Sequence, residues 1–386
     1  MENLLITKAR VCAMDGAWER GWLLAVDGRI QALGPGDPPA AGSRGVEVVD
    51  GCGTSTLLPG FIDLHVHGGD GADVMDADPD ALRRLARFHA RHGVTALLPT
   101  TWSASEADLA AALTAIGAAA GPVEGGAAIL GAHLEGPWIN AGRCGAQDPA
   151  AIRPPDPAEA ARLLGSGVVR LVALAPELDG APAVIDLCLQ RDVVVSAGHT
   201  DARYDQMAEA VRLGVTQVTH AYNAMSGFGH RDPGAVGAAL AFPELRCELI
   251  ADGVHVHPGA MAVLARAKGP DGVILVSDAT RAAGLPDGPV DLGGRTAHHT
   301  GGAVRLADGR LAGSALTLDV ALAHFAAASG WSWDQLWRAT SANAAAALGL
   351  AGKGHLSAGA DADLALVGDD GTVRLTVAGG RIVHRA

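Results

Sequence analysis

The hydrophobic positions of the chain follow two rhythms. Through the middle of the sequence, apolar runs of strand length alternate with Ala- and Leu-rich stretches of helical length. Runs that are apolar almost throughout are typical of parallel strands covered by helices on both faces. Eight segments have this character: 60–68, 93–102, 127–137, 168–178, 192–200, 214–223, 246–255 and 272–280.

Helical periodicity separates most of these segments. It is clearest in residues 78–92, 105–120, 201–214 and 258–269. A succession of eight strand-and-helix units predicts an α/β fold, a (β/α)8 TIM-like barrel. A doubly wound open sheet is the alternative, and it has less support because no strand-to-helix turn carries a GxGxxG sequence.

The two ends of the chain have a different pattern. Short alternating runs, broken by Gly, Asp and Pro, fill residues 1–58 and return in residues 351–386, where "DDGTV" is a hairpin signal. Neither end is long enough to bury a comfortable core by itself. We therefore expect one small β domain built from both chain ends, with the catalytic barrel formed by residues 59–350.

Composition and charge exclude several classes of protein. The 386 residues are 49% hydrophobic and 18% charged, which is typical of a globular protein with a sizeable core. A formal net charge of −13, with no basic run, argues against nucleic acid or an anionic membrane as a partner. The N-terminus lacks the pattern of a signal peptide, and no apolar run is long enough to predict a membrane span. Five cysteines without CxxC spacing indicate reduced thiols, so we expect a cytoplasmic protein.

Polar side chains gather where the predicted strands end. His65 and His67 end the first strand and project from one face, because residues i and i+2 of a strand point the same way. The carboxyl ends of barrel strands meet at one rim, where such folds carry their active sites. Imidazoles and carboxylates are ligands of divalent metals, so this rim predicts a metal-dependent hydrolytic site. The later strands end with His133 and Glu135, His199, His220 and Asn223, Asp252 with His255 and His257, and Asp278.

Other chemistries lack the residues that they require. The three lysines (Lys8, Lys268 and Lys353) all lie away from the strand ends. A carbamylated lysine bridging two metals and a Schiff base are therefore both excluded, and Glu135 is the strand-end group placed to bridge or anchor a metal. No GxSxG elbow occurs, and nothing in the sequence pairs Cys144 with a base, so a plain thiol is favoured over a nucleophile.

Several motifs together resemble a known family. The segments "PGFIDLHVHG", "HLEGPWIN", "THAYNAMSGFGHRDPGAVGAAL" and "LVSDAT" are similar to those of the N-acetylglucosamine-6-phosphate deacetylases, a branch of the amidohydrolase superfamily. The HxH pair alone indicates only the superfamily, whereas "HLEGP" with "THAYNAM" and "HRDPG" points to this branch. The similarity runs in order from residue 50 to the C-terminus, and it implies a barrel with a small β-sandwich.

The resemblance implies an activity. The expected reaction is metal-dependent hydrolysis of the acetamide of N-acetyl-D-glucosamine 6-phosphate to D-glucosamine 6-phosphate and acetate, in amino-sugar catabolism or recycling. One alternative is a deacetylase of N-acetylgalactosamine 6-phosphate, or of another N-acyl substrate, on the same scaffold. A second alternative, of another class, is a sugar-phosphate sensor without catalysis, which loss of Asp278 or a metal ligand would favour; none is lost.

The resemblance also implies roles for single residues. Glu135, His199 and His220 would ligate one catalytic metal. His65 and His67 would hold a second, so one or two divalent ions per subunit are expected, with zinc favoured over iron, manganese or cobalt. Asp278 would be the general base and then the acid. The implied substrate-binding set is Ala146, Gln147, Asn223, Ala224, Arg231, His255, Leu311, Ala312 and Gly313.

Within that set, the resemblance places Asn223, the Ala224 backbone and Arg231 on the phosphate and His255 on the sugar side. In the family this arginine can serve the pocket of a neighbouring subunit, so the resemblance implies a homodimer. Gln147 stands where a substrate-contacting histidine is common in the family. An amide donates a hydrogen bond but cannot become cationic, so the contact made at this position is left open.

Overall fold

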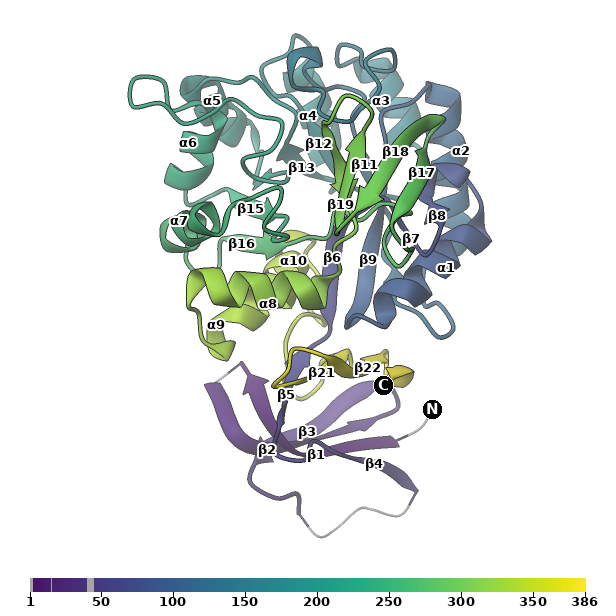
Figure 1. Cartoon of the computed structure of the whole chain (residues 1–386), viewed down its shortest axis with the longest axis vertical. Coiled ribbons are helices and arrows are strands. Elements are labelled where there is room, and N and C mark those ends of the chain that lie inside the picture. The colour runs from purple at the N-terminus through teal and green to yellow at the C-terminus, as the bar shows by residue number, and fades with distance from the viewer. Residues whose placement is uncertain (1–2, 15, 40–44) are drawn as a thin grey trace.

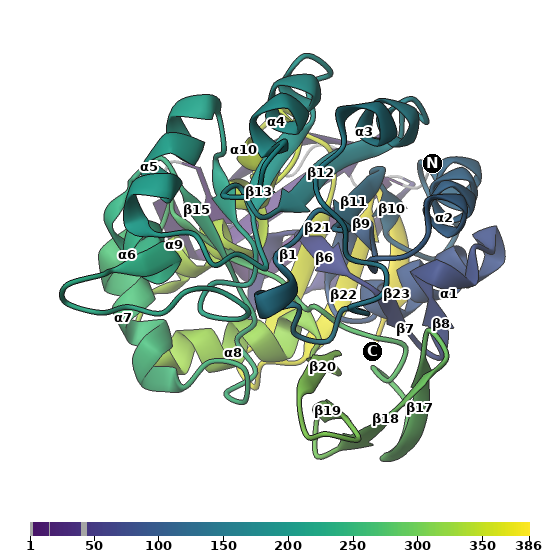
Figure 2. The same ribbon diagram turned by 90° about the horizontal axis from the view of Figure 1, so that it is seen from above.

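The computed structural model describes residues 3–14, 16–39 and 45–386. A barrel ringed by helices occupies most of the molecule, and a sheet that contains strands from both chain ends lies below it in Figure 1. A smaller four-stranded sheet lies beside the barrel rim, as the view from above in Figure 2 shows.

Eight parallel strands form the barrel in chain order, each hydrogen-bonded to the next. A parallel bridge between Val66 and Ala279 brings the last strand back to the first. Each of the eight predicted strand segments contains one of these strands, so the predicted barrel is confirmed. They are β6 (Phe61–Val66), β9 (Val94–Thr101), β11 (Ala132–Glu135), β12 (Val169–Leu174), β13 (Val194–Ala197), β14 (Gln217–Val218), β15 (Arg246–Leu249) and β16 (Val273–Leu275), with the short β10 (Ala128–Ile129) added beside β9.

Helices cover the outside of the barrel and bury its apolar strands. Every residue of β6 and β9 is buried, as expected of strands that face side chains on the inside and helices on the outside. The four predicted helices are confirmed as α1 (Pro79–Ala90), α2 (Glu106–Ala119), α5 (Tyr204–Leu213) and α7 (Pro258–Lys268). The others are α3 (Pro157–Leu164), α4 (Ala181–Leu189), α6 (Gly234–Ala241), α8 (Leu318–Ser329), α9 (Trp333–Trp337) and α10 (Asn343–Ala347), with short turns η1 (Val74–Asp76), η2 (Ala141–Arg143) and η3 (Arg338–Ala342).

Side-chain caps start the first two of these helices. The Asp78 carboxylate accepts from the backbone N–H of Asp80 at the start of α1, and Ser105 accepts from Asp108 at the start of α2. Such caps satisfy N–H groups that have no partner within the helix. In the part of the chain that the structure describes, no helix is both long and apolar enough to cross a membrane.

The two chain ends share one eight-stranded sheet. Its N-terminal and C-terminal parts join where β5 pairs antiparallel with β21, and a separate apolar cluster that includes Ile6, Leu57 and Leu364 fills one side. The hairpin predicted at residues 369–373 is confirmed between β21 and β22. The strands are β1 (Asn3–Ala13), β2 (Gly16–Val26), β3 (Arg29–Pro35), β4 (Val46–Asp50), β5 (Ser55–Pro59), β21 (Leu364–Gly368), β22 (Val373–Ala378) and β23 (Arg381–Arg385).

The four-stranded sheet beside the rim was not predicted. Its strands are antiparallel, and their residues alternate between buried and exposed, unlike the fully apolar barrel strands. A bridge between Ala279 and Ser314 ties its last strand to the barrel rim. The strands are β17 (Gly288–Leu292), β18 (Arg295–Thr300), β19 (Ala303–Leu306) and β20 (Leu311–Ser314); a two-stranded pair, β7 (Gly68–Gly69) and β8 (Ala72–Asp73), lies after β6.

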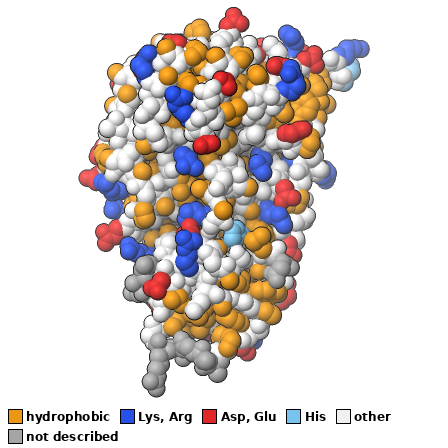
Figure 3. Space-filling view, turned by 180° about the vertical axis from the view of Figure 1, so that it is seen from behind, with side chains coloured by type: hydrophobic (Ala, Val, Ile, Leu, Met, Phe, Trp, Pro, Cys, Tyr) orange, Lys and Arg blue, Asp and Glu red, His pale blue; other side chains and the backbone are white. Residues whose placement is uncertain are grey.

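The far face of the molecule carries charges of both signs. In Figure 3, lysine and arginine side chains are interspersed with aspartate and glutamate over the barrel, and hydrophobic side chains gather lower, over the end sheet.

Acid should destabilise the fold through His89 of α1. This side chain is fully buried, its Nε2 donates to the Gly68 carbonyl at 2.9 Å, and its Nδ1 has no partner among the described residues. Burial lowers the pKa of His89 to about 4, whereas an unfolded histidine titrates near pH 6.5. The stabilisation is therefore complete above pH 6.5 and is lost as the pH falls through 4.

The variant His89→Gln keeps an N–H donor but does not titrate. Between pH 7 and pH 4 we expect the free energy of unfolding to fall by roughly 3 kcal/mol more in the wild type than in this variant. Urea denaturation followed by circular dichroism measures both proteins, and carboxylate titration cancels in the comparison. Identical pH dependence of the two proteins would contradict the assignment.

Candidate active site

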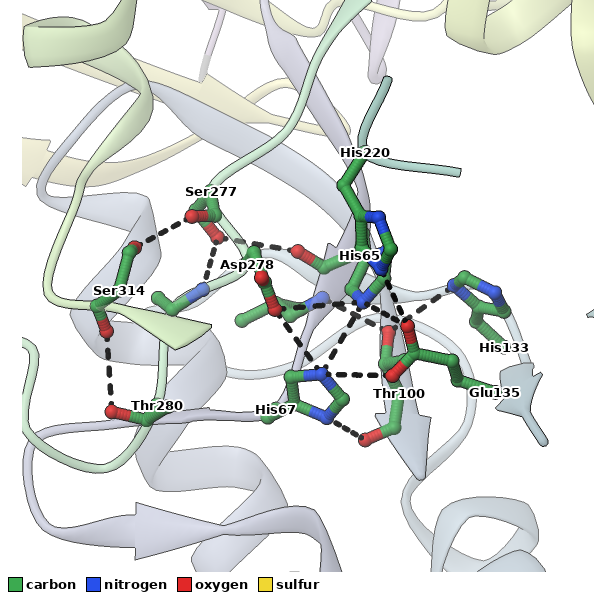
Figure 4. A network of polar contacts seen from close by, with 12 residues as sticks. His65, His67, Thr100, His133, Glu135, His220, Ser277, Asp278, Thr280 and Ser314 are labelled. Carbon is green, nitrogen blue, oxygen red and sulfur yellow. Dashed lines mark hydrogen bonds and ion pairs between the residues drawn. The ribbon is translucent and has the colours of Figure 1, made fainter. Parts of the chain in front are cut away.

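Six polar side chains lie buried at the carboxyl-terminal rim of the barrel. Figure 4 shows His65, His67, Glu135, His220 and Asp278 pointing toward one another, the two neighbouring histidines from the end of β6 and the other three from the ends of three other strands. None is more than 7% exposed. They are His65 near the end of β6, His67 just after it, Glu135 at the end of β11, His199 after β13, His220 after β14, and Asp278 after β16.

One group, the Glu135 cluster, consists of Glu135, His199 and His220. The Oε1 atom of Glu135 lies 3.1 Å from His199 Nε2 and 3.0 Å from His220 Nε2. The two Nε2 atoms are 3.1 Å apart. Two imidazole nitrogens and a carboxylate oxygen therefore surround one small volume, with all three atoms within 4.8 Å of one another.

A second group, the His65 cluster, consists of His65, His67 and Asp278. The Nε2 atoms of the two histidines are 3.2 Å apart, and Asp278 Oδ1 lies 3.2 Å from His67 Nε2. Glu135 stands between the two clusters: its Oε2 is 3.4 Å from His67 Nε2, and its Oε1 is 3.5 Å from His65 Nε2. One carboxylate thus contacts both histidine pairs.

Backbone carbonyls fix the tautomers of two of these histidines. His67 Nδ1 lies 3.0 Å from the carbonyl of Thr100, and His199 Nδ1 lies 2.9 Å from the carbonyl of Arg143. Because a carbonyl oxygen only accepts, each Nδ1 carries the proton and donates it. When the ring is neutral, each Nε2 therefore directs a lone pair into its cluster, the arrangement that a metal-binding histidine needs.

Glu248 performs the same task for His65. Its Oε2 lies 3.1 Å from His65 Nδ1, and its side chain is fully buried on β15. Glu248 lies outside the predicted set of site residues. A signal was present, since a carboxylate interrupts the apolar run "CELIA" at a position where only a partnered charge is tolerated.

A divalent cation fits both clusters. Two facing Nε2 lone pairs near 3 Å repel each other unless a proton or a cation lies between them. A carboxylate beside each pair completes a set of nitrogen and oxygen donors that zinc and similar ions prefer. The site can therefore bind a divalent metal.

The ionisation of the buried groups reflects their mutual attraction. Burial favours the neutral form of Glu135, but the positive charges of His65 and His199 hold its pKa well below the usual range. Burial also opposes charge on Asp278, yet His65 and His67 lower its pKa to about 2. Burial lowers the pKa of His67, but the hydrogen bonds that its ring donates to the Asp278 and Glu135 carboxylates raise it to about 9. These protons compete with a cation for the same lone pairs.

Three of the six residues have strained backbones. His199, His220 and Asp278 have φ of 48°, 32° and 48°, in the left-handed region that side chains with a Cβ rarely adopt. Such conformations cost roughly 1–3 kcal/mol each and persist where surrounding structure imposes them. Here each occurs just after a strand, where the chain turns sharply to aim its side chain inward.

A cavity of about 230 Å³ opens beside the clusters. A wider hollow, of about 600 Å³, lies near Arg153 and Arg162 but touches none of the six residues, so we place the site in the smaller cavity. The predicted residues that line the smaller cavity are His67, Glu135, Ala146, Gln147, His199, His220, Asn223, Ala224, His255, Asp278, Leu311 and Gly313.

Apart from His65, five predicted or candidate residues do not line the cavity, and one of them, Asp252, contacts His255 at 2.6 Å. Arg231 is exposed and does not line the cavity of its own chain, and Ala312 is buried in the apolar core of β17–β20. His133 donates to the Leu64 carbonyl at 3.0 Å and packs against His65 without lining the cavity. His257 is exposed and caps α7 by accepting from a backbone N–H.

Four residues of the cavity lining escaped the sequence prediction: Trp102, Gly145, Ile250 and Arg310. The Trp102 ring stacks on His67 with centroids 3.9 Å apart, and it follows β9 directly. Arg310, in the turn before β20, brings a cation to the mouth of the cavity. The tryptophan at a strand end was a usable signal, whereas an arginine in a polar turn resembles any surface arginine.

Comparison with known proteins agrees with this geometry. Residues 56–383 match the amidohydrolase family. The chain is 37% identical over 382 residues to the N-acetylglucosamine-6-phosphate deacetylase of Lysinibacillus sphaericus, covering 98% of this chain and 97% of that protein. It is 40% identical over 319 residues to the N-acetylgalactosamine-6-phosphate deacetylase of Escherichia coli O157:H7, covering 81% and 82%.

A solved structure is also similar over nearly the whole chain. A mutant of the Mycobacterium smegmatis N-acetyl-D-glucosamine-6-phosphate deacetylase, in complex with N-acetyl-D-glucosamine-6-phosphate, matches with a TM-score of 0.92 and 34% identity. The match covers 99% of this chain and 100% of that chain.

Metal content should depend on Glu135 more than on His65. Because Glu135 contacts both histidine pairs, Glu135→Ala should abolish stable metal binding, whereas His65→Ala should remove at most one ion per chain. The measurement is the metal-to-protein ratio after saturation with Zn²⁺ and gel filtration. His257→Ala, which changes an exposed histidine outside the site, serves as the control. Wild-type metal content in Glu135→Ala would contradict the arrangement.

Proposed function

The chain belongs to the amidohydrolase family, and from that premise we propose that it hydrolyses N-acetyl-D-glucosamine 6-phosphate to D-glucosamine 6-phosphate and acetate. The observation that carries the proposal is the convergence of the Glu135 cluster and Asp278 on one cavity. The chain that builds this cavity matches deacetylases of this name over nearly its full length. The reaction belongs to amino-sugar catabolism and recycling.

We assign the catalytic divalent metal to the Glu135 cluster and a second to His65 and His67. A metal bound at such a site polarises a carbonyl oxygen and lowers the pKa of water from about 16 towards about 7. The nitrogen and oxygen donors favour zinc among the candidate ions, with iron, manganese and cobalt as alternatives.

Asp278 moves the proton. Its carboxylate lines the cavity and accepts a proton from the water whose oxygen bonds to the acetamide carbon. When the bond between that carbon and the sugar nitrogen breaks, the protonated Asp278 donates the same proton to the nitrogen. One carboxylate thus acts as base and then as acid, and the products are acetate and the free amine.

Other cavity residues position the sugar phosphate. Asp252 anchors His255 through an Oδ2–Nδ1 contact of 2.6 Å, which leaves His255 Nε2 for the sugar side. Asn223 and the backbone of Ala224 face the same cavity and are assigned to the phosphate. Gln147, Ala146 and the segment Leu311–Gly313 border the substrate.

Arg231 is assigned to the phosphate bound by a second copy of the chain. It is exposed and does not line the cavity of its own chain, although it follows His220 in the same loop. A dianionic substrate approaching a protein of net charge −13 needs local cations, and the guanidinium fork matches a phosphate in a bidentate manner. A homodimer is therefore part of the proposal.

Deacetylation of the epimeric substrate, N-acetylgalactosamine 6-phosphate, is a second candidate function. The identity of 40% to a protein named N-acetylgalactosamine-6-phosphate deacetylase favours a test of that substrate. The two sugars differ in one hydroxyl orientation, and a site that hydrogen-bonds a substrate hydroxyl can reject an analogue that misplaces it. A non-catalytic sensor is disfavoured, since Asp278 and every assigned ligand are retained.

Three further assignments belong to the same proposal. We propose that the end sheet is a small β-sandwich, supported by its separate apolar cluster. The corresponding domain bounds are 1–58 and 351–386 for the sandwich and 59–350 for the barrel. A cytoplasmic location is supported by five free cysteines and by a phosphorylated substrate.

Acetate release from a small panel of sugars tests the proposal. We expect turnover of N-acetyl-D-glucosamine 6-phosphate to exceed that of its galactosamine epimer and of both unphosphorylated sugars. Asp278→Asn keeps the shape of the side chain but cannot accept a proton, so turnover should fall by several orders of magnitude while metal in the Glu135 cluster remains. Acetate release from none of the sugars, or near-normal turnover in the variant, would overturn the assignment.

Phosphate recognition should depend on Arg231. We expect Arg231→Ala to lower kcat/KM on the 6-phosphorylated sugar by an amount that corresponds to about 1.5–3 kcal/mol of transition-state stabilisation, the scale of a charge-assisted hydrogen bond. The kcat/KM for the unphosphorylated sugar should not change. Arg212→Ala, which removes an exposed arginine of α5, controls for the change in net charge. Equal losses on both sugars would mean that Arg231 holds the loop and does not bind phosphate.

Subunit complementation tests whether Arg231 acts across a dimer. Co-expressed Arg231→Ala and Asp278→Asn chains form mixed dimers in which one site has an intact Asp278 and receives Arg231 from the other chain. Activity in the purified mixed dimer, against weak activity in each parent, supports the assignment. Mixed dimers no more active than the parents would place Arg231 in its own chain's pocket.

A further inference from the structure

Gln147 is held between two groups that fix the direction of its amide. Its side chain is 1% exposed. The backbone N–H of Ser103 donates to Gln147 Oε1 at 2.6 Å, and Gln147 Nε2 donates to Glu135 Oε2 at 2.6 Å. A backbone N–H only donates and a carboxylate only accepts, so the amide has one orientation that satisfies both.

This hydrogen bond acts on the carboxylate that contacts both histidine pairs. With Oε2 bound by Gln147, Glu135 directs Oε1 to His199 and His220, at 3.1 and 3.0 Å. Without the Gln147 amide, Oε2 of the buried Glu135 carboxylate would lose this hydrogen-bond donor. The carboxylate would then no longer be held in this orientation. The neutral amide also supplies its N–H at any pH.

The loop that carries Gln147 orients a second ligand. The carbonyl of Arg143 fixes Nδ1 of His199, and a Cβ on Gly145 would lie 3.3 Å from the same imidazole ring. The residues 140–147 thus hold the carboxylate through Gln147 and one histidine through the backbone.

The four-stranded sheet holds this loop from the other side. Arg295 of β18 donates to the carbonyl of Ala146, and Arg310 donates to the carbonyl of Gly145 at 2.7 Å. The two arginines therefore clamp the carbonyls that immediately precede Gln147. Displacement of the backbone at Gly145 and Ala146 would require both contacts to break.

We propose that Gln147 is a positioning residue that orients Glu135 for metal binding, in addition to bordering the substrate cavity. The inference rests on the proposed metal role of the Glu135 cluster. Its consequence is that loss of the amide weakens metal affinity before it changes substrate affinity. A residue that only contacts the sugar phosphate would show the reverse.

The test compares metal affinity with substrate affinity in the full-length protein. Gln147→Glu replaces the donor with a second carboxylate of the same shape, and Gln147→Ala removes the side chain. Zn²⁺ affinity is measured by chelator competition, and the site geometry is followed by the visible absorption of bound Co²⁺. KM and kcat for N-acetyl-D-glucosamine 6-phosphate are measured at saturating Zn²⁺.

Gln190→Glu is the matched control. Gln190 is exposed at the end of α4 and donates to the Asp186 carboxylate at 2.8 Å, so this variant makes the same chemical change away from the cavity. Gln147→His, which keeps an N–H donor, is the rescue. We expect the control to match the wild type and the rescue to stay within about tenfold in Zn²⁺ affinity.

We expect Gln147→Glu to weaken Zn²⁺ binding by about 10–100-fold and to alter the Co²⁺ spectrum, a larger change than any rise in KM at saturating Zn²⁺. Wild-type Zn²⁺ affinity together with a raised KM would overturn the proposal and make Gln147 a substrate contact only. Wild-type values of both would overturn it as well. If Gln147→Glu does not fold, as judged by circular dichroism, Gln147→Ala decides by the same criteria.

Failure of the proposed function is distinguishable from failure of this inference. A wild-type protein that binds Zn²⁺ but releases no acetate from any sugar phosphate contradicts the deacetylase assignment. The Zn²⁺ and Co²⁺ measurements still report whether Gln147 orients Glu135.

Discussion

Closure of the parallel barrel is the constraint on which the site depends. The backbone N–H of Asp278 donates to the carbonyl of His65 at 2.9 Å, and His67 donates to Ala279 at 2.8 Å. Deeper in the barrel, Ser277 donates through its hydroxyl to Asp63 at 2.6 Å, and burial raises the pKa of Asp63 to about 6. These contacts join the first and last strands, so segments far apart in sequence present their polar side chains to one volume.

The charged side chains in that volume are buried, and burial disfavours the ionised form of a side chain. An isolated buried carboxylate would neutralise itself, yet the pKa of Glu135 and that of Asp278 are held low by neighbouring imidazoles. The imidazoles in turn are oriented by backbone carbonyls and by Glu248. The barrel supplies this network by strand register, and strained backbone after three strands sets the final direction of the side chains.

The sequence predicted the features that depend on residues close together in the chain. Near-continuous apolar runs predicted all eight barrel strands, and the polar residues that end those runs include the six that meet at the rim. The same pattern also pointed to His133 and His257, which do not line the cavity. The strands β17–β20 were missed because they are short, half-exposed and interrupted by Gly-Gly and Asp-Gly turns, so their hydrophobic signal is weak. The contact between Gln147 and Glu135 was also missed. It depends on how a loop without regular structure folds back over the rim, and backbone carbonyls such as that of Arg143 leave no mark in a sequence.

The small sheet β17–β20 supplies part of the cavity wall from outside the barrel, whereas the barrel strands and the loops that follow them carry the proposed metal ligands. It lies outside the barrel, yet its last strand brings Leu311 and Gly313 to the cavity wall, and its own apolar cluster is separate from the barrel core. Substitutions in this sheet can reshape the cavity wall without entering a barrel strand or replacing a metal ligand. Selection for a different sugar or acyl group therefore has a region in which to act outside the barrel strands, as long as Arg295 and Arg310 keep their contacts with the loop that carries Gln147.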